Sequence, residues 1–142
     1  MVNSRQKGAR GEEGVRDLLI KATGLAFERV PGSGCGRIKG DLHVPGQRNR
    51  FCIEVKNYAE SPLSDKVLTN KTNNMTQWWT KLRTQAKQCG QEPLLFFKYN
   101  RSKLFVATEL KPTKVNNFLY ISALGCYIMI CDEWLSSEGI TW

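Results

Sequence analysis

The chain has 142 residues, of which 41% are hydrophobic and 24% charged, so it fits one domain with a buried core and excludes a disordered chain. Its five cysteines are odd in number and form no Cys-x-x-Cys pair, which argues against a disulfide framework. We therefore expect a single domain over residues 1–142, in a reducing, cytoplasmic compartment. No apolar run is long enough to span a bilayer, and no membrane partner is expected.

The net charge of +8 is unevenly distributed. Residues 1–60 carry 11 basic and seven acidic side chains, residues 61–103 carry eight and two, and residues 104–142 carry two and four. A polyanion is the natural partner of such a surface, and nucleic acid is the commonest polyanion. A basic surface that only confers solubility is the alternative, and charge alone does not separate the two.

The first predicted elements are a flexible basic arm at residues 1–6 and a helix from residue 7 to Gly24. Val15, Leu18 and Leu19 give the helix an apolar stripe, and Glu12 lies on the same inward side. An inward carboxylate at a helix start is costly unless it is bound. Proximity to the positive helix N-terminus explains it equally well.

Three strands are expected next, at residues 25–30, 38–44 and 51–57, and a glycine-rich turn lies between the first two. The turn lacks the Gly-Lys-Ser/Thr of a phosphate-binding loop, and the strand that follows it excludes a dinucleotide fingerprint. We therefore expect no nucleotide cofactor. Arg37 and Lys39 at the end of the turn suit contact with phosphate groups.

The second and third strands carry the candidate catalytic residues. Glu54 and Lys56 project from one face of one strand, and pairing of the two strands as a hairpin brings Asp41 near Glu54. Two carboxylates and the carbonyl oxygen of Val55 are the hard ligands that Mg²⁺ prefers. Lys56 can orient water or neutralise charge in phosphodiester hydrolysis. A solvated strand face with a cross-strand pair is the plainer alternative.

The rest of the chain is predicted to complete a mixed α/β domain. Residues 57–74 are expected to form a mobile loop with a short helical turn near residues 64–68, followed by a helix at residues 75–89 whose two tryptophans belong to the core. Strands at residues 94–99 and 104–108, one or two strands within 118–131, and a helix at 133–137 follow. Three lysines are candidate DNA contacts in the loop and the long helix: Lys66, Lys71 and Lys81.

Zinc and thiol chemistry are weaker interpretations. Cys35, His43 and Cys52 have no conventional zinc spacing, and the only histidine belongs to no paired motif. A cysteine–histidine nucleophile pair also lacks any orienting context.

Four segments together resemble the archaeal-type Holliday junction resolvases of the PD-(D/E)xK nuclease superfamily. They are Lys7-Gly8-x-x-x-Glu12, Arg29-Val30-Pro31-Gly32-Ser33-Gly34, Asp41 and Glu54-Val55-Lys56. The family pattern has proline before the aspartate, where this chain has Gly40. The size of the chain and its long tryptophan-bearing helix also resemble compact phage-encoded nucleases, which implies the host-cell cytoplasm.

The resemblance implies a restriction-endonuclease-like fold: a mixed central sheet flanked by helices. It implies Glu12, Asp41 and Glu54 as ligands of Mg²⁺, with Mn²⁺ as a substitute, Lys56 as the catalytic lysine and Ser33 in the active-site loop. The expected substrate is branched double-stranded DNA, cut at four-way junctions by the paired symmetric nicks of a homodimer. Arg29, Arg37 and Lys39 join the three lysines above as candidate DNA contacts.

Two other functions stay open. The same chemistry could serve restriction or repair cleavage of other DNA, because a fold does not fix a substrate. A basic DNA-binding module without catalysis is the second alternative.

Overall fold

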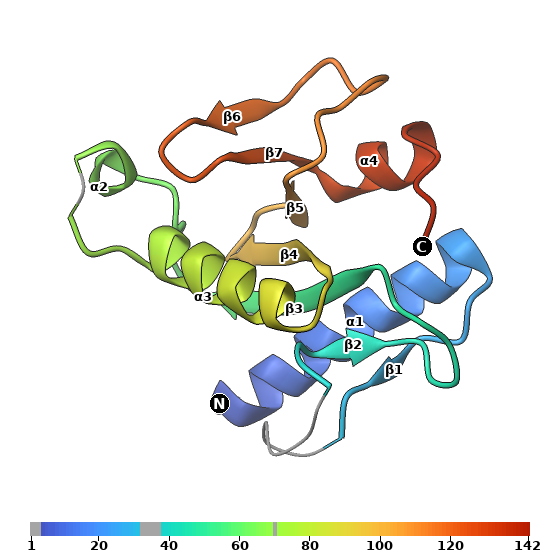
Figure 1. Ribbon diagram of the computed structural model, residues 1–142. Helices are drawn as coiled ribbons and strands as arrows, with labels where there is room; N and C mark the ends of the chain where they lie inside the picture. Colours follow the sequence, from blue (N-terminus) through green and yellow to red (C-terminus); the bar gives the residue numbers. More distant parts are fainter. Residues whose placement is uncertain (1–3, 32–37, 70) are drawn as a thin grey trace.

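A seven-stranded sheet forms the centre of the protein in the computed structural model, which describes residues 4–31, 38–69 and 71–142 (Figure 1). The strand order is β1-β2-β3-β4-β5-β7-β6, and all neighbours are antiparallel except the parallel pair β3 and β4. The strands are β1 (Glu28–Arg29), β2 (Leu42–His43), β3 (Phe51–Tyr58), β4 (Glu92–Tyr99), β5 (Phe105–Thr108), β6 (Leu119–Ile121) and β7 (Cys126–Ile130). The helices are α1 (Ser4–Thr23), α2 (Asp65–Leu68), α3 (Asn74–Gln88) and α4 (Cys131–Ser137).

Strand β4 is buried on both faces, which explains its continuous apolar sequence. Leu94 and Phe96 belong to one hydrophobic cluster, and Leu95 and Phe97 belong to the other. All four side chains are fully buried. The prediction of a central strand here is confirmed.

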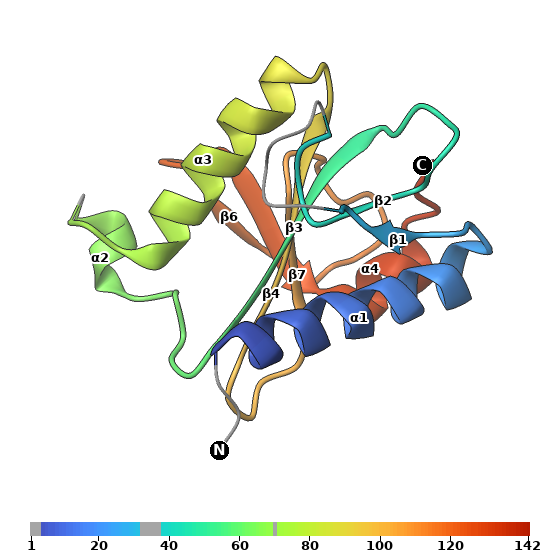
Figure 2. The ribbon, with the colours of Figure 1, turned by 90° about the horizontal axis from the view of Figure 1, so that it is seen from below.

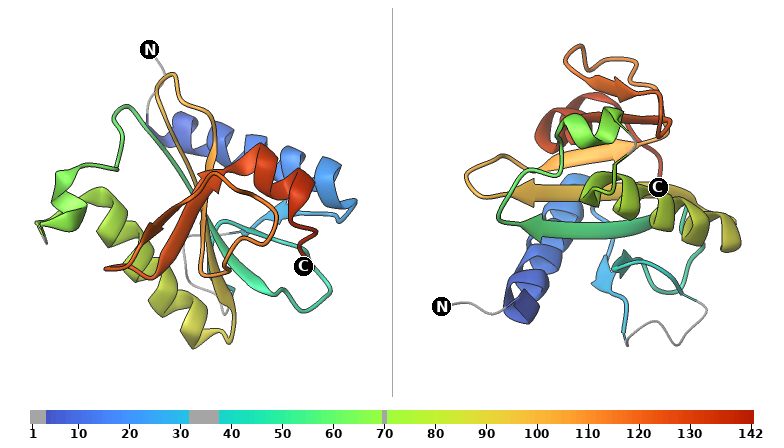
Figure 3. Two further views of the ribbon diagram at one scale, coloured as in Figure 1. Left: turned by 90° about the horizontal axis from the view of Figure 1, so that it is seen from above. Right: turned by 90° about the vertical axis from the view of Figure 1, so that its left-hand side faces the viewer.

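The two clusters lie on opposite faces of the sheet (Figure 2). Helices α1 and α4 cover the first cluster through residues such as Leu19 and Trp134, and α3 covers the second through Trp79. The left view of Figure 3 shows α1 and α4 on one side of the sheet and α3 on the other. The predicted mixed sheet flanked by helices is confirmed, as is the prediction that Trp78 and Trp79 belong to the core.

Helix α1 starts earlier than predicted. It begins at Ser4, so the expected flexible arm at 1–6 overlaps the helix, and residues 1–3 lie outside the described part of the chain. The polar residues before residue 7 carry no apolar stripe, so periodicity gave no signal for them. The predicted end is confirmed: Gly24 has φ +74°, and its N–H donates to the Ile20 carbonyl at 2.8 Å.

Strands β1 and β2 are shorter than the predicted strands 25–30 and 38–44. Phe27 N–H donates to the Leu25 carbonyl, so the chain turns locally before β1. After β2, Val44 N–H donates to the Asn49 side chain at 2.7 Å and leaves the strand ladder. Before β2, Gly40 adopts φ +89°, which is not a strand conformation. Local hydrogen bonds and this one glycine therefore limit both strands.

The predicted loop at residues 57–74 is partly regular. Strand β3 extends to Tyr58, and α2 confirms the expected helical turn. Asn73 caps α3, its side chain accepting from Thr76 N–H at 2.9 Å. The 118–131 segment forms the two strands β6 and β7, and α4 starts two residues before the predicted helix. None of the helices in the described segments is both long and apolar enough to cross a bilayer.

Glu138, just after α4, anchors the segment that precedes β6. Its carboxylate accepts from the backbone N–H groups of Thr113, Lys114 and Val115 at 2.6 to 2.7 Å, and from the Thr113 hydroxyl at 3.0 Å. Desolvation raises the pKa of Glu138, but the four hydrogen bonds outweigh it and lower the pKa to about 2.

The Glu138→Gln variant should lose part of this anchor, because a neutral amide has one acceptor oxygen in place of two. We expect the melting temperature to fall by a few degrees at pH 7. A lowered folded-state pKa stabilises above the unfolded-state pKa of 4.5, and this contribution disappears as the pH falls from about 4.5 to about 2. The gap between the two proteins should therefore narrow at pH 3. A Glu109→Gln control should show no gap, and an equal gap at both pH values would contradict the assignment.

Candidate active site at the open edge of strand β3

The candidate site lies where β3 continues past its partner β2. The register of the two strands pairs Leu42 with Ile53, and β3 runs on for five more residues to Tyr58. In place of a further strand partner, the Asp41 carboxylate accepts from Val55 N–H at 2.8 Å. A side chain thus completes the backbone pairing and fixes one carboxylate at the open edge.

Gly40 lets the backbone approach β3 closely enough to place Asp41 in this position. A Cβ atom on Gly40 would lie 2.6 Å from the Ile53 carbonyl oxygen, and its φ of +89° disfavours any side chain. The next residue, Asp41, donates its N–H to the same carbonyl at 2.6 Å. Proline cannot adopt a positive φ, so the departure from the family's proline has a local structural reason.

Four of the five predicted catalytic residues line one cavity of about 400 Å³. Its walls are Gly8 and Glu12 of α1, Asp41, and residues 54–59 of β3 and the turn after it. Glu54 and Lys56 point into it from the same face of β3, with Lys56 Nζ 3.3 Å from Glu54 Oε1. The structure therefore brings Glu12, Asp41, Glu54 and Lys56 together, as the hairpin prediction requires.

The Glu12 carboxylate forms a salt bridge with Arg29 in this arrangement. Arg29 Nε donates to Glu12 Oε2 at 2.7 Å, and Arg29 Nη1 lies 3.9 Å from Glu13 Oε1. Within the described segments, no three acidic, histidine or cysteine side chains are arranged to hold a metal ion. Of the three acids that line the cavity, Glu12 is held by Arg29, Glu54 lies next to Lys56, and Asp41 accepts from Val55 N–H.

The pKa of Asp41 is raised, because the side chain is partly buried in a cavity that holds more negative than positive side chains. Burial raises its pKa most, and the nearby Glu54 and Glu12 raise it further. The Val55 N–H and the charge of Lys56 act in the opposite direction, and the pKa settles at about 7. A half-buried carboxylate near two others gains most from a divalent cation, so the donor set fits a hard metal ion.

The candidate DNA contacts are spread over three places. Lys81 shares a cavity of about 210 Å³ with Glu54 and Lys56, and Lys66 lines a separate cavity of about 590 Å³ beside Tyr58. Lys71 is exposed, and Arg29 is engaged with Glu12. Ser33 and Arg37 lie outside the described residues.

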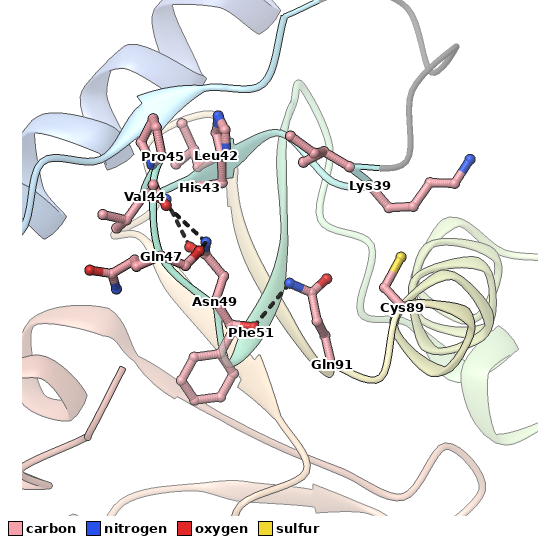
Figure 4. Close-up of a pocket in the computed structure, with 12 residues that line it drawn as sticks. Lys39, Leu42, His43, Val44, Pro45, Gln47, Asn49, Phe51, Cys89 and Gln91 are labelled. Atoms are coloured by element: carbon pink, nitrogen blue, oxygen red, sulfur yellow. Dashed lines mark hydrogen bonds between the residues drawn. The ribbon is translucent and has the colours of Figure 1, made fainter.

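Lys39 lines a third cavity, of about 380 Å³, together with His43 and Cys89 (Figure 4). Its side chain extends away from His43 in that view. The buried His43 Nε2 has no hydrogen-bond partner among the described residues. Cys52 lies in the core under α3, and burial raises the pKa of its thiol to about 12, which suits a packed side chain and not a nucleophile.

Three residues near the site were missed by sequence reasoning. Tyr58 lines the cavity of Asp41 and Glu54, and Gln77 and Gln85 line the cavity of Lys81. Two signals could have found them. Tyr58 continues the alternation of Glu54 and Lys56, and the two glutamines lie four residues before and after Lys81 on one helix face.

Comparisons with known proteins found a family model, a relative and a solved structure that are similar to this chain. Residues 3–124 match the family model described as "Phage putative PDDEXK endonuclease". Protein D14 of Escherichia phage T5 is 36% identical over 125 residues, which cover 83% of this chain and 78% of that protein. A solved structure of Archaeoglobus fulgidus Hjc, a Holliday junction resolvase from an archaeal hyperthermophile, has 24% identity and a TM-score of 0.47, covering 92% of this chain and 93% of that one.

The close approach of Gly40 to β3 can be tested against a matched glycine. Gly46 also has a positive φ, +77°, but a Cβ atom there would meet nothing within 4 Å. Both Gly→Ala variants should lose about 1–3 kcal/mol of unfolding free energy from backbone strain. Gly40→Ala should lose more, because its Cβ collides with Ile53, as measured by urea denaturation. Equal losses in the two variants would show that the close approach is unimportant.

The raised pKa of Asp41 predicts an unusual gain of stability in the Asp41→Asn variant. In the metal-free protein, folding holds a proton on Asp41 that the unfolded chain releases above pH 3.8, so this group destabilises the fold increasingly up to about pH 7. Asparagine keeps an acceptor for Val55 N–H without a charge. In EDTA at pH 8 we expect the variant to be more stable by of the order of 1–3 kcal/mol, with a smaller difference at pH 5.

Thermal unfolding at both pH values measures this difference. Added Mg²⁺ should then raise the melting temperature of the unchanged protein at pH 8 and leave that of the variant unaltered. A variant less stable than the unchanged protein at pH 8 would contradict the electrostatic account of the site.

Proposed function

The chain belongs to the phage family of PDDEXK endonucleases, and from this premise we propose that it is a Mg²⁺-dependent enzyme that cuts branched DNA. The resemblance to phage-encoded nucleases of the PD-(D/E)xK superfamily, expected from the sequence, is confirmed. Four-way junctions are the proposed substrate, and paired symmetric nicks the proposed product. The observation that carries the proposal is the meeting of Asp41, Glu54 and Lys56 in one cavity.

Asp41 and Glu54 are the proposed metal ligands, and the Val55 carbonyl oxygen is the third. The N–H and C=O of one strand residue point to the same edge of the strand. Because Val55 N–H points to Asp41, its carbonyl faces the same open edge. A divalent cation bound there would stabilise charge on the phosphate and lower the pKa of a water molecule.

Lys56 and Glu12 have separate proposed roles. The Lys56 ammonium group, 3.3 Å from Glu54, is positioned to hold a phosphate oxygen or the attacking water and to neutralise developing charge. Glu12 is the proposed additional acid of the site, and its carboxylate is available as a further metal ligand. Its partner Arg29 is 44% exposed at the side chain, so the guanidinium could turn from Glu12 to a DNA phosphate if Glu12 served as a metal ligand.

The proposed path of the DNA follows the remaining basic side chains. Lys81 stands beside Lys56 in the smaller cavity, and Lys66 and Lys71 are exposed around α2. Lys39 lies apart from these lysines, in the separate cavity that His43 also lines. Such contacts position the phosphate backbone without reading the base sequence, as a structure-specific enzyme requires. Ser33 and Arg37 remain predicted members of the site.

The proposed enzyme is a homodimer, because two symmetric nicks in a four-way junction require two active sites related by a two-fold axis. The outer strand β6 supports an interface in the C-terminal third. Leu119 and Tyr120 are 56% and 52% exposed, and the neighbouring Phe118 is 38% exposed. An uncovered apolar edge strand is a surface that natural proteins seldom leave open.

Cleavage assays test the function directly. A labelled four-way junction and its separate linear arms would be offered to the purified protein in Mg²⁺ or EDTA. We expect symmetric nicking of the junction only, abolished by EDTA and reduced at least about 100-fold in Asp41→Asn and Lys56→Ala. Asp132→Asn and Lys111→Ala, which change exposed residues away from the cavity, should cut normally.

Other outcomes separate the remaining functions. Equal cutting of the linear arms would favour restriction or repair cleavage. Tight binding without cutting in any divalent metal would indicate a DNA-binding module and would contradict the enzymatic proposal.

A further inference from the structure

Tyr58 occupies the boundary between two cavities next to the candidate active site. Glu54, Lys56 and Tyr58 alternate along one face of β3, so the tyrosine ring lies one pleat beyond the lysine. It lines the cavity of about 400 Å³ that holds Asp41, and also the cavity of about 590 Å³ beside α2. It is 42% exposed, so part of the ring is open to a ligand in either cavity.

The ring of Tyr58 is supported from behind. The Trp78 ring lies 4.8 Å away between centroids at an interplanar angle of 39°, and Trp78 is only 9% exposed in the core under α3. One face of Tyr58 is therefore packed against a fixed indole, while part of the ring stays open to solvent. Little side-chain freedom is left to lose when another ring stacks on it.

The charges on either side of Tyr58 differ. The catalytic cavity holds Lys56 together with Glu12, Asp41 and Glu54, and Lys81 lines the adjoining cavity of Glu54 and Lys56. A phosphate group is favoured there when the cation of the proposed function neutralises the three carboxylates. The cavity beside α2 is lined by Glu60 and Asp65 as well as by Lys66 and uncharged side chains such as Asn74. Two carboxylates disfavour a phosphate there, but they accept hydrogen bonds from the amino groups of a nucleobase. The arrangement suits a nucleotide whose phosphate lies toward Lys56 and whose base lies toward α2.

We propose that Tyr58, backed by Trp78, is a stacking platform for an unpaired nucleobase next to the scissile phosphate. The cavity beside α2 receives that base. This inference rests on the proposed nuclease function and adds a reason for choosing branched DNA. A base within continuous duplex is paired and stacked on both sides, and releasing it is costly. Releasing a base costs less at a branch point, where the stack is interrupted, and least in a bulge, where the base is already unpaired.

Binding measurements test the platform in EDTA, where the DNA stays uncut. The probes are a four-way junction, a duplex with a three-nucleotide bulge and the matching continuous duplex, each with a fluorescent label. Tyr58→Leu keeps the apolar bulk and loses the ring, and Tyr58→Phe keeps the ring and loses the hydroxyl. Base stacking on an aromatic residue implies a loss of about 5- to 100-fold in affinity when the ring is removed.

We expect Tyr58→Leu to bind the junction and the bulge about 10-fold more weakly while its affinity for continuous duplex is unchanged, and Tyr58→Phe to bind all three normally. A 2-aminopurine in the bulge should be quenched by the unchanged protein and by Tyr58→Phe but not by Tyr58→Leu. Failure of the unchanged protein to bind any DNA would overturn the proposed function. Normal binding by the unchanged protein with no selective loss in Tyr58→Leu would overturn the platform alone.

Discussion

One hydrogen bond, from Val55 N–H to the Asp41 carboxylate, joins the fold to the chemistry of the site. It ends the pairing of β2 with β3 and replaces the next strand contact with an acidic side chain. Gly40 permits it by lying against Ile53 where no side chain fits. The same contact holds Asp41 close enough to Glu54 for the two carboxylates to repel each other. The backbone geometry of the hairpin thus creates a repulsion that a bound cation would relieve.

Strand β3 changes its role along its length. Its first residues are core on both faces, with Ile53 in the cluster under α1 and Cys52 in the cluster under α3. From Glu54 onward, the face toward α3 carries polar and aromatic side chains that line cavities. Rigid packing at one end of the strand thus positions reactive groups at the other, as a preorganised site requires.

Sequence periodicity predicted the elements whose burial is regular and missed those set by single contacts. The apolar run of β4 and the helical stripe of α3 were both readable, because each repeats over several residues. The meeting of Asp41 with Glu54 followed from hairpin pairing. The Arg29–Glu12 pair and the Asn49 side chain that takes Val44 N–H could not be foreseen, because they depend on how separate segments meet in space. The alternation of Glu54, Lys56 and Tyr58 could have placed Tyr58 near the site, but its support by Trp78, on which its proposed role depends, comes from a distant helix and could not be foreseen.

The parallel pairing of β3 with β4 has a consequence for the time at which the protein acquires activity. All eight residues of β3 are matched with β4, and residues 59–91 separate the two strands in the chain. The acids at positions 41 and 54 leave the ribosome well before β4 does, yet the strand that carries Glu54 gains its central partner only with β4. Because such non-local pairing forms late, an incomplete nascent chain is expected to hold the proposed catalytic residues without being able to cut the nucleic acid around it.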